Sequence, residues 1–228
     1  MRNLTYRVGG DEVRIHVLEF EDSDISDVLH LIEHAEPYEL CLDTETTGLN
    51  IFQPDFRIRT VQIGDATDAY VIQMKSVRDA RARKVLDAAF DKGVTIHNSS
   101  FDLLAAHATG LKPLSETQNG YHDTKLMAHL IDPRSKQDGG IGFGLKDLSA
   151  RYVDPSAPDT QNGLIEEFRK IKCTKDTGWA KIDINNPTYL LYAGLDVILG
   201  SRLHRRLRMM VNRGGFGRLA RFEHDVQR

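Results

Sequence analysis

The N-terminal third of the chain alternates apolar and polar residues with the two-residue period of β-strands. Residues 4–8 and 12–20 alternate on either side of a Gly-Gly-Asp segment, which predicts a β-hairpin with a tight turn. Three further strands are predicted at 39–46, 57–65 and 69–74. Because only three residues separate the last two of these strands, they are expected to pair as a hairpin.

Elsewhere the apolar residues follow the 3.6-residue spacing of amphipathic α-helices. The first of these helices is expected to begin after Ser23 or Asp24, either of which suits an N-cap. Gly93 and Gly110 are expected to end two later helices, because glycine accepts the backbone conformation that closes a helix. Helices are predicted at 23–36, 77–91, 100–110, 123–131, 145–153, 164–172 and 188–211.

The order of these elements predicts an α/β fold with a mixed sheet. Three antiparallel strands come first, parallel strands follow, and helices flank the sheet. One short apolar strand, at 94–98, lies between two helices. Two segments rich in glycine, proline and polar residues, at 132–144 and 172–187, are predicted to be mobile loops.

Composition is that of an ordinary globular chain, with 228 residues, 40% apolar and 28% charged. The N-terminus lacks the apolar core of a signal peptide and no apolar run has membrane-spanning length, so we expect a cytoplasmic protein with no membrane partner. Cys41 and Cys173 are too few for a disulfide framework. The nine histidines are expected to form no H-x-x-x-H or other zinc pattern.

Charge is unevenly distributed along the chain. The net charge is −3, but the segment from Arg202 to Arg228 contains eight arginines against Glu223 and Asp225, so this segment carries +6 and the rest −9. A solvated helix face, or a surface that meets another domain, is the favoured interpretation. A strip that contacts phosphates is the alternative.

The strand at 39–46 carries two carboxylates near its end. Side chains two positions apart on a strand share a face, so Asp43 and Glu45 project together, just before a turn at Thr47 and Gly48. Two carboxylates at this distance repel unless a proton or cation lies between them, and oxygen ligands favour Mg²⁺ or Mn²⁺. A solvated strand end is the simpler alternative.

Two further carboxylates can complete such a site. Asp102 lies in the first turn or so of a helix that Asn98 is expected to cap. Asp196 lies in a helix that is apolar almost all round, where a carboxylate needs a partner to offset desolvation. Tyr192, one turn earlier, shares its face. The alternatives are that Asn98 is only a helix cap and that Tyr192 is a core tyrosine.

The order D-x-E, N-x-x-x-D and Y-x-x-x-D resembles the three exonuclease motifs of the DEDD superfamily. Over about residues 10–210 the chain is most similar to the 3′-5′ proofreading domain of family A DNA polymerases. Leu191 stands where the histidine branch has its histidine, so Tyr192 favours the tyrosine branch. Ribonuclease D-like enzymes share this motif and often have an upstream tryptophan, as Trp179 is here, so an RNA substrate stays open.

The resemblance implies an RNase H-like exonuclease fold and a mechanism with two Mg²⁺ or Mn²⁺ ions. In that scheme Asp43, Glu45 and Asp196 hold one ion, and Asp43 and Asp102 hold the other. Tyr192 and Glu45 would orient the attacking water. The residues expected to contact substrate are Leu49, as a wedge against the terminal base, with Thr44, Asn98, Phe101 and Lys146.

Lys146 and Arg151 are the residues considered for phosphate contact, with exposed surface charge as the plainer interpretation.

The resemblance implies a metal-dependent 3′-5′ exonuclease that acts on single-stranded DNA ends as a monomer and releases nucleoside monophosphates. Residues 1–210 would form the exonuclease domain, and 211–228 the start of a following polymerase domain or a C-terminal tail, in a phage or bacterial polymerase. Two alternatives stay open. One is an inactive module that holds DNA within a polymerase, and the other is a ribonuclease D-like enzyme that trims RNA 3′ ends.

Overall fold

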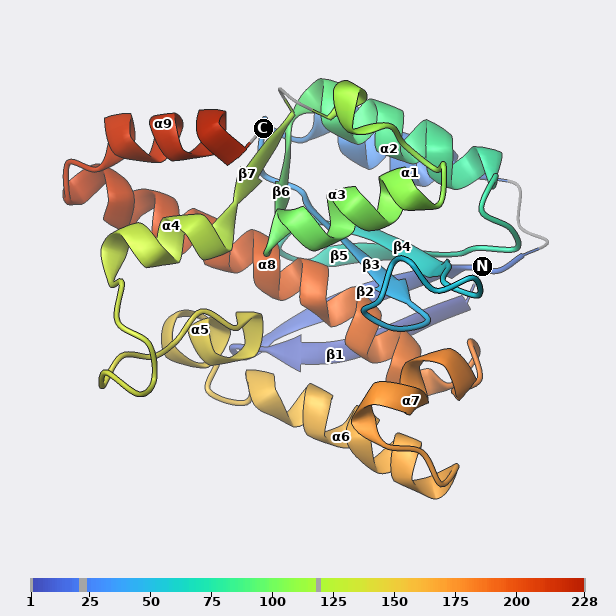
Figure 1. Ribbon diagram of the computed structural model, residues 1–228. Coiled ribbons are helices and arrows are strands. Elements are labelled where there is room, and N and C mark those ends of the chain that lie inside the picture. Colours follow the sequence, from blue (N-terminus) through green and yellow to red (C-terminus); the bar gives the residue numbers. More distant parts are fainter. Residues whose placement is uncertain (1, 21–23, 118–119, 228) are drawn as a thin grey trace.

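A seven-stranded mixed sheet forms the centre of the molecule, with strand order β1-β2-β5-β4-β3-β6-β7. The computed structural model describes residues 2–20, 24–117 and 120–227. Figure 1 shows helices packed against both faces of this sheet. The strands are Arg2–Val8 (β1), Asp11–Leu18 (β2), Cys41–Thr46 (β3), Ile58–Gly64 (β4), Asp68–Gln73 (β5), Val94–Ile96 (β6) and Tyr121–Asp123 (β7).

The helices divide between the two faces of the sheet. Helices α1, α2 and α3 pack on one face around a hydrophobic core, whereas α6 and α8 pack on the other. A third cluster joins α4, α5, α8 and α9. The helices are Ser26–His34 (α1), Ala80–Lys92 (α2), Ser99–Ala108 (α3), Thr124–Ile131 (α4), Leu145–Tyr152 (α5), Ala157–Lys170 (α6), Lys175–Lys181 (α7), Pro187–Arg213 (α8) and Gly217–Gln227 (α9), and Leu114–Glu116 form a 3₁₀ turn.

Strand pairing confirms the predicted mixed α/β sheet. Strands β1 and β2 form the predicted antiparallel hairpin, and β3, β4 and β5 pair antiparallel in sequence order. Strands β6 and β7 then extend the sheet parallel to β3. The hydrophobic pattern does not predict β7, because two of its three residues, His122 and Asp123, are polar, whereas β6 lies in an apolar run.

The segment 172–187 is not the loop that its composition predicts, because it contains α7. Thr174 and Thr177 form a capping box at the start of this helix. Gly178 lies against the ring of Phe168, where a Cβ atom would come within 2.2 Å of the ring. Glycine is therefore a packing requirement here and not a sign of mobility.

Two helix starts also differ from the prediction. Helix α6 begins at Ala157, seven residues before the predicted start, with Pro158 in its first turn, where proline is favoured. The cap position of α1 is Ile25, which makes no side-chain cap bond, although the Asp24 carboxylate accepts the N–H of Ser26 at 2.9 Å. Ser23, the other predicted cap, lies outside the described residues.

Strand β3 alternates between the two cores. Leu40 and Leu42 face the core under α1 and α2, whereas Cys41 faces α8. Helix α8 comes very close to the sheet because Gly200 lies on Cys41 and Gly194 lies on Ile15, where added Cβ atoms would approach neighbouring side chains to 2.3 and 2.5 Å. This close packing sets the distance between α8 and the strand that carries Asp43 and Glu45.

Among the described residues, no helix is long and apolar enough to span a bilayer.

Candidate active site

Strand β3 and helix α8 bring three carboxylates together. Asp43 and Glu45 lie on the same side of β3 as Cys41, toward α8, and the register against β4 shifts directly after Glu45. Asp196 comes from the buried middle of α8. Oxygen atoms of Asp43, Glu45 and Asp196 all lie within 4.8 Å of one another. The strand periodicity alone predicts the first pair, and the resemblance predicts its meeting with Asp196.

Asp102 joins this group from α3 on the other side of β3. One of its carboxylate oxygens accepts two hydrogen bonds from Thr44, from the backbone N–H at 3.0 Å and from the hydroxyl at 2.6 Å. Thr44, which is predicted to contact substrate, therefore holds Asp102 beside the other carboxylates.

Asn98 occupies the N-cap position of α3, but its side chain makes no cap hydrogen bond, so the prediction that it caps the helix is wrong in this respect. Its backbone is in the left-handed region, with φ at 64°, and its side-chain oxygen accepts a bond from Lys125 at 2.8 Å. The Asp123 carboxylate caps the helix instead, by accepting the N–H groups of Asn98 and Ser99 at 3.1 and 2.9 Å.

Asp123 also connects the start of α3 to the C-terminal helix. Its carboxylate accepts a bond from the Gln227 amide at 3.0 Å, and its backbone N–H donates to His224 at 2.8 Å. Asp123 stands in the three-residue strand β7 and belongs to none of the three sequence motifs, so no motif predicts its role.

Burial raises the pKa values of all four carboxylates, and repulsion by neighbouring carboxylates of the cluster adds to this at Asp43 and Glu45. Burial raises the pKa of Asp43, and the charges of Asp102, Glu45 and Asp196 raise it further. Burial and the charge of Asp196 likewise raise the pKa of Glu45, and burial raises that of Asp196. The pKa of Asp102 rises to about 7 through burial, although the bonds from Thr44 oppose this. Such a cluster holds protons unless cations replace them.

Lys146 is a cation that contacts this cluster. Only 8% of the residue is exposed, so its interpretation as surface charge is wrong. The ammonium forms an ion pair with the Asp196 carboxylate and lies over the Tyr192 ring, 4.5 Å from its centroid. Arg151, the other residue considered for phosphate contact, is exposed on α5.

Two adjoining cavities, of about 500 and 510 Å³, open on either side of the carboxylates. The first is bounded by the loop after β3 and by α7, and the second by the starts of α3 and α5. Both are lined by Asp43, Phe101, Tyr192 and Asp196, the first also by Glu45, Leu49, Lys175 and Trp179, and the second also by Asn98, Asp102 and Lys125. Leu49 is 80% exposed at the mouth of the first cavity.

Arg59 anchors the wall of the first cavity and is a second functional residue that none of the sequence motifs contains. This buried side chain on β4 donates to the backbone carbonyls of Trp179 and Ile182, the second at 2.6 Å. These bonds hold the end of α7, and with it Trp179, whose ring lies 5.7 Å from that of Tyr192. An arginine inside an apolar strand is the sequence signal for this role.

Among the described residues, none of the arginines from Arg202 to Arg221 lines either cavity. Arg202 donates to the carbonyls of Val8 and Ala66 and pairs with Asp11, and Arg205 pairs with Glu39. This arrangement agrees with the favoured interpretation of a helix surface and not with a strip that contacts phosphates at this site.

The donor set fits a hard divalent cation. All four acidic groups offer oxygen atoms, and three of them already lie close enough to share one ion. Burial, and at Asp43 and Glu45 also the neighbouring carboxylates, raise these pKa values, and a bound cation would offset the buried negative charge.

A second possible metal-binding group lies on α1, where His30, Glu33 and His34 come together. The expectation that the histidines contain no zinc pattern is wrong, because His30 and His34 have the H-x-x-x-H spacing. This spacing is the signal by which the sequence identifies the group.

Solved structures with similar folds are nucleases. NrnC of Brucella melitensis bound to pGG has a TM-score of 0.61 at 19% identity, covering 93% of this chain and 87% of that chain. The catalytic core of RRP6 from Trypanosoma brucei has a TM-score of 0.61 at 12% identity, covering 94% of this chain and 51% of that chain. At these identities the likeness concerns the fold, and it confirms the predicted RNase H-like exonuclease fold.

Curated relatives are polymerases much longer than this chain. The DNA polymerase of Mycobacterium phage D29 is 33% identical over 217 residues, which are 92% of this chain and 35% of the relative. DNA polymerase I of Aquifex aeolicus strain VF5 is 30% identical over 177 residues, 77% of this chain and 24% of the relative. The 3′-5′ exonuclease family model matches residues 20–212. The chain therefore belongs to the 3′-5′ exonuclease family of the family A DNA polymerase type.

Proposed function

We propose that this chain is a metal-dependent 3′-5′ exonuclease that removes nucleoside monophosphates from the 3′ ends of single-stranded DNA. The observation that carries the proposal is the meeting of four carboxylates from β3, α3 and α8, with Tyr192 beside them, between two open cavities. An inactive copy of the fold gains nothing from such a cluster, because its buried carboxylates repel one another.

The cluster would hold two Mg²⁺ or Mn²⁺ ions. Asp43, Glu45 and Asp196 are the proposed ligands of one ion, and Asp43 and Asp102 of the other. When bound, such a pair of ions lowers the pKa of water and stabilises charge on the attacking and leaving oxygens of the phosphodiester.

The surrounding side chains position these groups. Thr44 fixes the orientation of the Asp102 carboxylate through its two hydrogen bonds. Lys146 offsets the charge of Asp196 and restrains that side chain next to Tyr192. Glu45 and Tyr192 are the proposed groups that orient the attacking water.

The cavities suit a strand end whose last bases are unpaired. Leu49 at the mouth of the first cavity would wedge against the terminal base, and Phe101, which lines both cavities, would contact the next nucleotide. Asn98 and Lys125 line the second cavity, where a neutral amide and an ammonium can contact a phosphate. DNA is the favoured substrate because the curated relatives are named DNA polymerases.

A ribonuclease that trims RNA 3′ ends is the second candidate. Trp179, the feature shared with ribonuclease D-like enzymes, lies in the wall of the first cavity, where its ring can stack on a base of either nucleic acid. An inactive module that holds DNA within a polymerase is the third.

One assay separates these candidates. Single-stranded DNA and RNA labelled at the 5′ end are incubated with the chain in Mg²⁺, in Mn²⁺ or in chelator. We expect a DNA ladder that shortens from the 3′ end, is abolished by Asp43→Ala and Asp196→Ala, and is weakened by Tyr192→Phe.

Asp91→Ala, which removes an exposed carboxylate from α2, is the matched control and should retain the ladder. Faster digestion of RNA would favour the ribonuclease. No digestion of either substrate with any metal would favour the inactive module.

We further propose that the parent chain contains a polymerase domain beyond the exonuclease domain of residues 1–210. The relatives are about three times as long as this chain, which supports the proposal. Residues 211–228 would lead toward that domain, while α9 packs back on β7 through His224 and Gln227. A primer-extension assay tests this proposal. The parent gene product should extend a primer, and this chain alone should not.

A further inference from the structure

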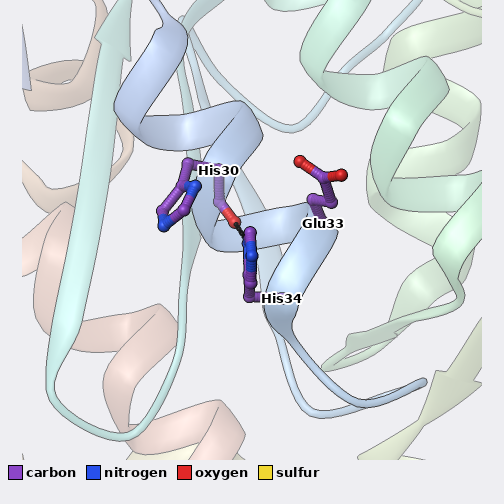
Figure 2. Close-up of side chains that lie close together, drawn as sticks. All are labelled: His30, Glu33 and His34. Atoms are coloured by element: carbon purple, nitrogen blue, oxygen red, sulfur yellow. Dashed lines mark hydrogen bonds between the residues drawn. The ribbon is translucent and has the colours of Figure 1, made fainter.

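The outer face of α1 carries two histidines and a glutamate at helical spacing. His30, Glu33 and His34 stand at positions i, i+3 and i+4, and all three are exposed. At 100° per residue they fall on the side of the helix opposite the buried Val28 and Ile32. One ligand atom from each side chain lies within 4.8 Å of the others. Figure 2 shows the three side chains on the last turns of α1.

The ring of His34 has a defined protonation pattern. Its Nδ1 atom lies 2.9 Å from the carbonyl oxygen of His30, and this bond is the dashed line in Figure 2. A carbonyl only accepts, so Nδ1 carries the proton of this bond, and in the neutral ring Nε2 is then the nitrogen with the lone pair. A bond from one ring nitrogen to a backbone carbonyl is the usual arrangement that orients a histidine to bind a metal through the other.

The position of the group in the helix also favours a cation. Glu33 and His34 lie in the last turn of α1, where the unpaired carbonyls carry partial negative charge. The Lys92 ammonium donates to the Glu33 carbonyl at 2.8 Å and so ties this turn to the end of α2. The imidazole rings of His30 and His34 already lie 4.0 Å apart between centroids, so little rearrangement separates them from shared ligation.

We propose that His30, Glu33 and His34 form a surface binding site for a zinc-class divalent cation. Two imidazoles and one carboxylate suit Zn²⁺ or Ni²⁺, with a coordination position left open, whereas Mg²⁺ prefers the all-oxygen set of Asp43, Glu45 and Asp196. The proposed zinc site lies on α1, which precedes the start of β3. Glu45 of the carboxylate cluster stands near the other end of β3, so the two sites are separate. The exposed side chains exclude no water, so the site binds the cation without a hydrolytic role.

Zinc content measures this site directly. The full chain is dialysed against about 10 µM Zn²⁺ in about 5 mM Mg²⁺, which occupies oxygen-ligand sites. We expect the wild-type chain to retain one more Zn²⁺ per chain than the double variant His30→Gln/His34→Gln. Glu33→Gln is expected to weaken Zn²⁺ binding about tenfold, because one of three ligands is lost.

The matched control is His107→Gln, which removes an exposed histidine from the last turn of α3. This variant should retain the wild-type zinc content. Circular dichroism in chelator should be the same for all four proteins, because every changed side chain is exposed. Equal zinc content in the wild type and the double variant, or an equal loss in the His107 control, would overturn the proposal.

Discussion

Lys146 is the residue at which the electrostatics of the carboxylate cluster can be tested one charge at a time. Its ammonium is buried between the carboxylate of Asp196 and the ring of Tyr192. A buried ion pair adds little over an apolar pair, but removing one partner leaves the other charge without compensation. Without Lys146, Asp196 must therefore take up a proton, bind a cation or destabilise the fold.

We expect Lys146→Met to lower the free energy of unfolding by about 3 kcal/mol at pH 8 in chelator. At pH 5 the loss should be smaller, because Asp196 can then bind a proton. Mg²⁺ should restore more stability to this variant than to the wild type. Lys175→Met, which removes an exposed lysine of the first cavity, should change stability by less than about 0.5 kcal/mol. Urea unfolding measures the free energy of unfolding in each case. Equal losses in Lys146→Met and Lys175→Met would contradict the expectation that Asp196 depends on Lys146.

At the scale of elements, Asp123 joins β7 to the start of α3 and to α9. Asp123→Ala leaves two N–H groups at the start of α3 without their acceptor, which costs about 1–2 kcal/mol. Because Phe101 and Asp102 follow in the same turn, we also expect the exonuclease rate to fall. Asp79→Ala removes the cap of α2, which lines neither cavity, and should cost similar stability at an unchanged rate. An equal loss of rate in both variants would mean that instability alone lowers activity.

The contact between α8 and the sheet depends on two glycines, and Gly194→Ala tests it. The added methyl would overlap Ile15, which is fully buried, so we expect a loss of about 1–3 kcal/mol and a displaced Asp196. Gly163→Ala is the control within α6, where the nearest atom is 3.6 Å away and alanine should stabilise the helix by about 0.5–1 kcal/mol. Thermal unfolding gives the sign of each change. A stabilising Gly194→Ala would show that α8 can shift without cost.

At the scale of the whole molecule, the sequence predicts the elements whose patterns are local. The hairpins, the mixed sheet and the long helices follow from hydrophobic period and glycine position. Helix α7 was not predictable in this way, because its glycine serves a contact with Phe168 on another helix. The cap at the start of α3 comes from Asp123 on β7, and the C-terminal end of α7 is held by Arg59 on β4, and no local pattern records such pairings.

The candidate site was predictable only through its motifs. Strand alternation predicts the pairing of Asp43 with Glu45, and helix spacing predicts that of Tyr192 with Asp196. Composition and periodicity do not predict that these two pairs lie close together in the fold. The family resemblance predicts it. The burial of Lys146 depends on how α5 meets α8, which the order of residues along either helix does not determine.

Stability of the whole molecule should respond to pH through these carboxylates. In the unfolded chain they lose their protons near pH 4, whereas the pKa of Asp102 in the folded chain is about 7. Between these values the folded state binds more protons, so Asp102 makes the free energy of unfolding fall as pH rises. His97 and His204, whose pKa values burial lowers to about 4, have the opposite effect below about pH 6.5. A comparison with Asp102→Asn separates the two contributions.

We expect Asp102→Asn to stabilise the metal-free chain by about 2 kcal/mol more at pH 7.5 than at pH 5. The amide keeps an oxygen that can accept both bonds from Thr44, so the packing around residue 102 is preserved. Mg²⁺ should remove the extra stability of Asp102→Asn, because the bound cation stabilises the wild type at pH values where its carboxylates have lost their protons. Asp132→Asn is the control, since a bond from Arg134 lowers the pKa of Asp132 to about 2 and leaves it ionised throughout this range. Parallel pH profiles for the wild type and Asp102→Asn in chelator would mean that Asp102 is already ionised in the folded chain at pH 5.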